Sequence, residues 1–145
     1  MNIYIDSSWD SGGLPRVNIS QGVVLAREEW NTATDSSGNR THYSFEQTSE
    51  QASADFIIRR GTPTSGRCAE INQAVHPHTI TLSSDYDNME ADNVAAVIAH
   101  ELGHRVGLSN MGSDGCPFSN SSIMNGYSGA CIQNVREVSQ NDVAN

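Results

Sequence analysis

Five consecutive residues, His100 to His104, have the composition and spacing of a metal-dependent hydrolytic site. They read H-E-L-G-H, so on a helix the two histidines, four residues apart, point the same way, one turn above the other. Two imidazoles in this arrangement bind one metal ion, and Zn²⁺ is the metal that the pair predicts. Glu101 is rotated by about 100° from His100, near enough to hold a metal-activated water without binding the metal. This is the position of the general base in metal-dependent peptide hydrolysis.

A third ligand is expected from the turn that follows. Gly107 comes three residues after His104 and suits the left-handed conformation that ends a helix. Such a turn would return Asn110 toward the same metal. An amide oxygen is neutral and a poorer zinc ligand than imidazole or carboxylate. Coordination by Asp114 instead, or an impaired metal site, therefore stays open beside coordination by Asn110.

The residues before the motif predict the helix that carries it. Positions 92–99 contain no glycine or proline. Asp87 followed by Glu90 predicts a capping box at the start. Apolar residues recur at helical spacing and predict a stripe that faces the core: Val94, Val97, Ile98 and Leu102.

The pattern extends beyond the five-residue motif. Gly107 is followed by a methionine-containing turn, Ser-Ile-Met-Asn-Gly, at 122–126. With this extension the chain resembles the metzincin clan of zinc endopeptidases over most of its length. Residues 115–131 are most similar to the snapalysin-like small secreted proteases. The chain departs from both at Asn110, where the clan has His and the snapalysin-like branch has Asp.

The resemblance implies an α+β, metzincin-like (zincin) domain. It implies a twisted mixed sheet of about five strands, a backing helix, an active-site helix, and a short C-terminal helix after the Met-turn. One catalytic domain would span 1–145, with an N-terminal subdomain of about 1–107 and a C-terminal subdomain of 108–145. Extended substrate would lie against the edge of the strand at 69–75, which forms the rim of the cleft.

The resemblance also assigns roles in the C-terminal part. Met124 would lie under the metal as an apolar floor. Tyr127 is a candidate for contact with the transition state, although the related proteases place their tyrosine two residues after the methionine and here it is three; packing is the alternative role. Cys116 and Cys131 lie on either side of the Met-turn, as in the similar proteases, which implies a disulfide. Cys68 is then left over as a buried apolar residue, a free thiol or an attachment point.

Further elements follow from periodicity. The segment 17–34 predicts a long helix, with Trp30 as an anchor in the core. The strand at 54–60 has adjacent apolar residues, which predicts burial on both faces. Expected strands are listed from the N-terminus: 3–5, 41–46, 54–60, 68–75 and 78–82.

The totals limit the functions that remain. The chain has 145 residues and a formal net charge of −9, which argues against nucleic acid as a partner. No apolar run reaches the length that spans a membrane. Residues 1–6 are not a signal peptide, so a secreted protein would have lost its signal and any pro-segment. We expect a secreted monomer.

Two other groups of residues resemble metal-binding sites, but each group has a simpler explanation. His76 and His78 form an H-x-H pair, but no carboxylate has the required spacing, and surface positions are expected. Acidic residues before the motif helix could bind Ca²⁺, yet the EF-hand pattern is absent and an acidic helix start accounts for them: Asp85, Asp87, Asn88, Glu90 and Asp92.

The sequence thus predicts a zinc-dependent endopeptidase that acts on an extended peptide or protein substrate. Two alternatives remain. One is a peptide-binding zincin domain in which the substitution at Asn110 has impaired catalysis. The other is a zinc hydrolase of a non-peptide amide on the same scaffold. Glu101 favours an enzyme, because a structural zinc site has no need of a general base.

Overall fold

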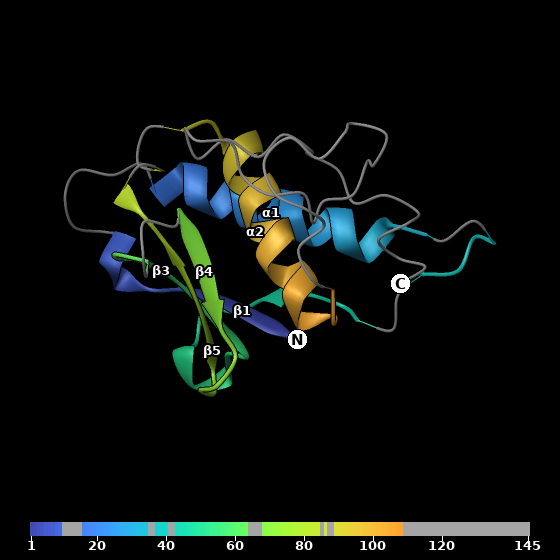
Figure 1. Cartoon of the computed structure of the whole chain (residues 1–145), viewed down its shortest axis with the longest axis horizontal. Coiled ribbons are helices and arrows are strands. Elements are labelled where there is room, and N and C mark those ends of the chain that lie inside the picture. The colour runs from blue at the N-terminus through green and yellow to red at the C-terminus, as the bar shows by residue number, and fades with distance from the viewer. Residues whose placement is uncertain are drawn as a thin grey trace.

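The fold is α+β, as predicted, with one sheet and two α-helices (Figure 1). The computed structural model describes residues 1–9, 16–34, 37–40, 43–63, 68–84, 86 and 89–108. The helices are α1 (Arg16–Thr32) and α2 (Ala91–Arg105), and short 3₁₀ helices η1 and η2 span Ser7–Trp9 and Gln51–Ser53. In the part of the chain just specified, no helix is long and apolar enough to cross a membrane.

The sheet is mixed and has five strands, as expected from the sequence. Its strands are β1 (Asn2–Ile5), β2 (Glu46–Gln47), β3 (Phe56–Arg60), β4 (Ala69–Asn72) and β5 (His78–Leu82). Their order is β2-β1-β3-β5-β4. All neighbouring pairs are parallel except β4 and β5, which are antiparallel. The antiparallel strand β4 therefore lies at the edge of the sheet.

The strand expected at 41–46 is shorter and begins later. Residues 41 and 42 lie outside the described residues, and β2 contains only Glu46 and Gln47. Just before it, the Asn31 side chain of α1 bonds to the Phe45 backbone twice. The Asn31 Nδ2 donates to the Phe45 carbonyl and its Oδ1 accepts from the Phe45 amide, both at 2.8 Å. The Asn31 side-chain amide thus forms the hydrogen bonds to the Phe45 backbone that a neighbouring strand would otherwise form.

The prediction that β3 is buried on both faces is wrong. Phe56 and Ile58 are fully buried, whereas Ile57 is half-buried and Arg59 is exposed. This alternation shows that one face of the strand meets the core and the other is accessible. The adjacent apolar residues in the sequence resembled those of a strand covered on both sides, but Ile57 is covered only in part.

The two α-helices pack closely against each other. A Cβ added at Gly22 of α1 would lie 2.7 Å from Cγ1 of Val94 in α2, so the glycine permits the approach. Near the other end of the contact, the indole Nε1 of Trp30 donates to the Ala99 carbonyl at 2.9 Å. Trp30 is fully buried and acts as the predicted anchor. The predicted stripe of α2 is confirmed, since all four of its members have no exposed surface: Val94, Val97, Ile98 and Leu102.

The start of α2 differs from the prediction, and its end agrees with it. The N-cap is Glu90, without a side-chain cap hydrogen bond, so the expected capping box of Asp87 and Glu90 is wrong. The helix begins three residues too late for Glu90 to occupy the third helical position that a capping box requires. At the other end Gly107 has φ +99°, in the left-handed region. The turn predicted from this glycine is confirmed.

Candidate metal centre

The two histidines of the motif lie on consecutive turns of α2, as predicted. The ring centroids of His100 and His104 are 5.1 Å apart, and the rings are nearly perpendicular, at 84°. Zn–N distances of about 2.0–2.1 Å and a tetrahedral angle place two imidazole centroids on one ion about 5.2 Å apart. The observed separation therefore fits two ligands of a single tetrahedral zinc ion.

A hydrogen bond fixes the tautomer of His104. Its Nδ1 lies 2.9 Å from the Leu108 carbonyl oxygen. A carbonyl can only accept, so Nδ1 carries the proton and, in a neutral ring, Nε2 has the free lone pair. Histidines that bind metals commonly donate their second N–H to a carbonyl in this way. The bond orients the ring and leaves Nε2 as the ligand atom.

The turn at Gly107 supplies that carbonyl. The Gly107 amide donates to the His104 carbonyl at 3.1 Å, and the Leu108 amide donates to the Gly103 carbonyl at 3.0 Å. These are the two bonds of a Schellman motif, which a glycine at this position favours. The motif turns the chain back over the last helical turn, so the Leu108 carbonyl faces the His104 ring. The sequence predicted the turn but not this contact.

His100 and Glu101 are both buried. Their exposed fractions are 2 % and 3 %, among the very few buried polar residues of the described chain. His104, one turn further on, is partly accessible. Burial strengthens electrostatic interactions, because water screens charges less in the interior. A carboxylate held here beside a metal ligand has the placement that a general base requires.

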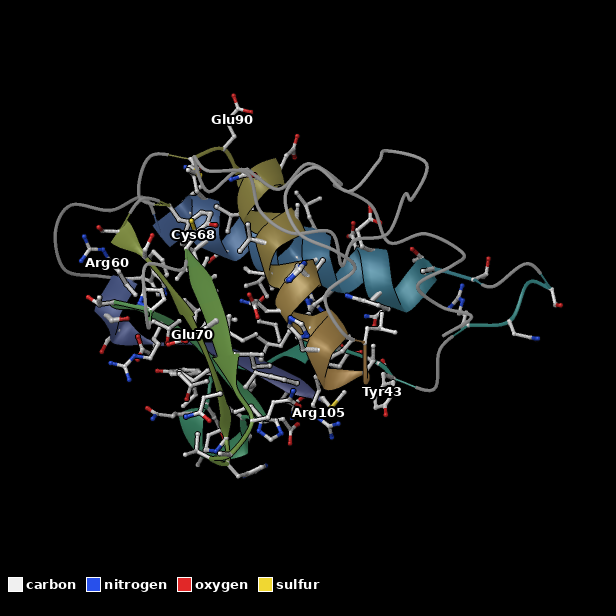
Figure 2. The ribbon with its side chains drawn as sticks, in the orientation of Figure 1. Tyr43, Arg60, Cys68, Glu70, Glu90 and Arg105 are labelled. Carbon is white, nitrogen blue, oxygen red and sulfur yellow. The ribbon has the colours of Figure 1, made fainter. Side chains whose placement is uncertain are left out.

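The C-terminal end of α2 is held by two further contacts. The Arg105 guanidinium lies 5.8 Å from the centroid of the Tyr43 ring, and both residues are labelled together in Figure 2. The Gln73 side chain, just after β4, donates to the His104 carbonyl at 3.3 Å. A cation at the end of a helix also interacts favourably with the helix dipole. The turn at the end of α2 is therefore attached to the edge of the sheet.

The predicted cleft rim, 69–75, contains the edge strand β4. The Ser83 amide donates to the Cys68 carbonyl at 2.9 Å, which makes these two residues a hydrogen-bonded pair. Pairs alternate along an antiparallel ladder, so the next pairs that bond to β5 are Glu70 with Thr81 and Asn72 with Thr79. The alternation directs the backbone N–H and C=O of Ala69 and Ile71 toward the outer edge.

The remaining predicted site residues lie outside the described residues. These are Asn110, Asp114, Cys116, Met124, Tyr127 and Cys131. The expected Met-turn and C-terminal helix lie there too. Within the described ranges, no group of three or more His, Cys, Asp or Glu side chains could hold a metal ion. The described part of the centre thus contains two candidate metal ligands and the candidate base, and all three assignments, like the third ligand, stay predictions.

Cys68 forms a disulfide, so the expectation that it is left over is wrong. It lies next to the start of β4, where Figure 2 labels it. Its partner is not among the described residues. The chain has three cysteines, so a bond from Cys68 to Cys116 or Cys131 excludes the expected bond between these two. The expectation relied on the resemblance to proteases with cysteines on either side of the Met-turn, and that resemblance says nothing about which cysteine the fold brings beside Cys68.

In the second histidine pair, His76 lies at the surface, as predicted, whereas His78 is half-buried with its ring centroid 5.6 Å from that of Phe56. The His76 side chain is 71 % exposed, and its Nε2 is 3.8 Å from Asp55 Oδ1. The Nδ1 of His78 bonds to the Val75 carbonyl at 2.9 Å. No carboxylate near the pair in sequence has the required spacing, but the fold brings Asp55, the residue just before β3, close to His76. The three side chains still do not form a metal-binding group.

A comparison with models of protein families finds a match. The model of the family Peptidase_M57, described as dual-action HEIGH metallo-peptidase, matches residues 14–130. Read as residues, HEIGH agrees with residues 100–104 at every position except Leu102, where the letters give Ile. No curated protein matches the chain. The match covers most of the chain, so the protein belongs to the Peptidase_M57 family of metallopeptidases, which are zincin-type enzymes that hydrolyse peptides with a catalytic metal.

Proposed function

We propose that this metallopeptidase is a zinc-dependent endopeptidase, with His100 and His104 as metal ligands and Glu101 as the general base. The observation that carries the proposal is the pair of imidazoles 5.1 Å apart, one of them with its tautomer fixed by the Leu108 carbonyl. Zinc is favoured because both donors are imidazole nitrogens. Asn110 is the proposed third ligand, and Asp114 is the alternative.

Each residue of the motif has a separate chemical task. His100 and His104 would hold the zinc ion, which when bound would supply Lewis acidity toward a water molecule and the scissile carbonyl. Glu101 accepts the proton of the attacking water and then delivers it to the leaving amine. His104 is held in the ligand tautomer by the Leu108 carbonyl, so it enters the reaction already oriented.

The substrate is proposed to bind as an added strand along β4. The backbone groups of Ala69 and Ile71 are directed toward the outer edge, and β4 contacts α2. An extended peptide paired with these two residues would run along the edge that Gln73 attaches to the metal-binding turn. Main-chain pairing is largely independent of the peptide sequence, so extended or unfolded segments are the expected substrate class.

The proposal includes predictions for the part of the chain that the structure leaves undescribed. Met124 is the apolar floor under the metal, and Tyr127 contacts the transition state or packs. A C-terminal subdomain of 108–145 completes the cleft in a layout similar to the snapalysin-like proteases. We further propose a secreted monomer. These points rest on the resemblance in sequence and on the match to a metallopeptidase family.

Cleavage of unfolded casein tests the proposal. Wild type and Glu101→Ala are each assayed with and without a zinc chelator, and products are identified by mass spectrometry. We expect internal peptide-bond cleavage by the wild type, lost both with chelator and in the variant, and restored to the wild type by added zinc. Zinc binding by Glu101→Ala shows that the site is intact. A folded, zinc-loaded wild type that leaves casein uncut would contradict the proposal and favour a binding role, with Asn110 the first suspect.

A further inference from the structure

The chain contains two tryptophans, and both are fully buried with the indole N–H on a backbone carbonyl. Trp9 donates to the Ile58 carbonyl in the central strand β3 at 3.2 Å. Trp30, near the end of α1, donates to the Ala99 carbonyl of α2 at 2.9 Å. The two side chains are thus alike in burial and bonding. They differ in what they hold, because Ala99 immediately precedes His100.

The Trp30 bond reaches a carbonyl inside a helix. In an α-helix the Ala99 carbonyl accepts from the amide four residues on, that of Gly103. A second donor from another element adds a directional contact that resists both sliding of α2 along its axis and rotation about it. The next two residues are His100 and Glu101, so any such movement would displace a metal ligand and the base together.

Apolar packing holds this turn against the core without a directional contact. The residues of α2 beside and within the motif that belong to the core are Ala96, Val97, Ile98, Ala99 and Leu102. The close approach of Gly22 to Val94 fixes the spacing of the two helices near the start of α2. The Trp30 hydrogen bond is the corresponding contact at the level of the motif. Hydrogen bonds have angular preferences that non-directional apolar contacts lack.

We propose that Trp30 is a positioning residue for the metal centre, acting through the Ala99 carbonyl on His100 and Glu101. The inference rests on the proposed roles of those two residues. Trp30 does not touch substrate or metal in this proposal. Its N–H holds the turn in the register in which His100 binds and Glu101 faces the attacking water.

The test compares Trp30→Phe with Trp9→Phe as the matched control. Each variant loses an indole N–H from a fully buried site and leaves a similar cavity, so the loss of packing is shared. A third protein carries β-(3-benzothienyl)alanine at position 30, which keeps the bicyclic shape and replaces only the N–H. For each we would measure the zinc dissociation constant, kcat and KM on a peptide, and amide hydrogen exchange along 56–60 and 91–105.

Trp30→Phe and the benzothienyl protein should each raise the zinc dissociation constant about tenfold, in the range seen when an outer-shell partner is lost. They should lower kcat at least about tenfold, because Glu101 is displaced as well, with KM within about twofold since β4 is untouched. Amide exchange should accelerate around 99–104. Trp9→Phe should change zinc affinity and kcat less than about twofold and accelerate exchange in β3 instead.

Equal effects of the two phenylalanine variants on zinc affinity and on exchange in α2 would overturn the proposal. So would a benzothienyl protein that behaves as wild type, because the N–H would then have no role. A wild type that binds zinc without cleaving peptide would refute the proposed function alone, since zinc affinity would still report on Trp30. If the wild type does not bind zinc, amide exchange in α2 still tests the proposal, because this measurement requires no metal. Equal exchange in the two phenylalanine variants would then overturn it.

Discussion

Gly107 offers a test of how the end of α2 contributes to the metal centre. The Gly107→Ala substitution places an L-residue at φ +99°, where a Cβ would meet nothing within 4 Å. Its cost is therefore backbone strain, of about 1–2 kcal/mol for the left-handed region. Loss of glycine flexibility in the unfolded chain offsets about 0.4–1 kcal/mol of this. The free energy of unfolding should fall by about 1 kcal/mol.

The effect on metal binding should be larger than this loss of stability implies. Any relaxation of the strain moves the Leu108 carbonyl oxygen, which lies 2.9 Å from His104 Nδ1 and accepts its proton in a hydrogen bond. Loss of such an outer-shell partner typically weakens metal binding about 10–100-fold, or about 1.4–2.7 kcal/mol. We expect the zinc dissociation constant of Gly107→Ala to rise by this factor, measured by competition with a chromophoric chelator.

Gly38→Ala is a matched control. Gly38 also has positive φ, +84°, and also has no atom within 4 Å of an added Cβ. It lies in the chain between Thr34 and Arg40, which form an isolated β-bridge after the end of α1. Both variants should lose similar stability in urea, but only Gly107→Ala should lose zinc affinity. Equal zinc affinity in the two proteins would refute the role assigned to the turn.

Three other predictions concern packing, substrate and metal. Gly22→Ala should lower the free energy of unfolding by about 1–3 kcal/mol, because its Cβ would lie 2.7 Å from Val94 Cγ1; unchanged urea denaturation would contradict this packing. Ile71→Pro removes a backbone amide that faces the outer edge of β4, without breaking a hydrogen bond to β5. The KM of this variant should be several-fold higher than that of Ile71→Ala, and an equal KM would argue against strand addition. Asn110→Asp should tighten zinc about tenfold, or about 1.4 kcal/mol, whereas an unchanged dissociation constant would argue against Asn110 as a ligand.

The parts of the structure that the sequence predicted well are those determined by nearby residues. The motif helix and its buried stripe follow from apolar periodicity, and observed α2 differs from the prediction mainly at its N-cap. The turn at Gly107 follows from one glycine three residues after His104. Strand β5 was predicted with its observed bounds, His78–Leu82, because Pro77 marks its start. In each case the signal lies within one or two helical turns of the element.

The contacts that the sequence did not predict join residues far apart in the chain. Trp30 bonds to Ala99 across 69 positions, and the Asn31 side chain replaces a strand partner for Phe45. The sequence around Trp30 and Asn31 contains no local pattern that indicates which backbone group each side chain will bond to. The disulfide of Cys68 is of the same kind, because pairing depends on which cysteines the fold brings together. Such contacts hold the site in place, so its residue types were predictable and its positioning was not.

The burial of Glu101 bears on whether the centre is catalytic. An ionised carboxylate with 3 % of its surface exposed loses most of its hydration, and burial of a charge is unfavourable unless specific partners compensate it. A centre that only bound zinc would not need a general base at this position. The neighbouring Leu102 shows that an apolar side chain can pack at this level of α2 without exposure. A base that accepts a proton from water does need a carboxylate there, so the burial of Glu101 supports the proposed catalytic role.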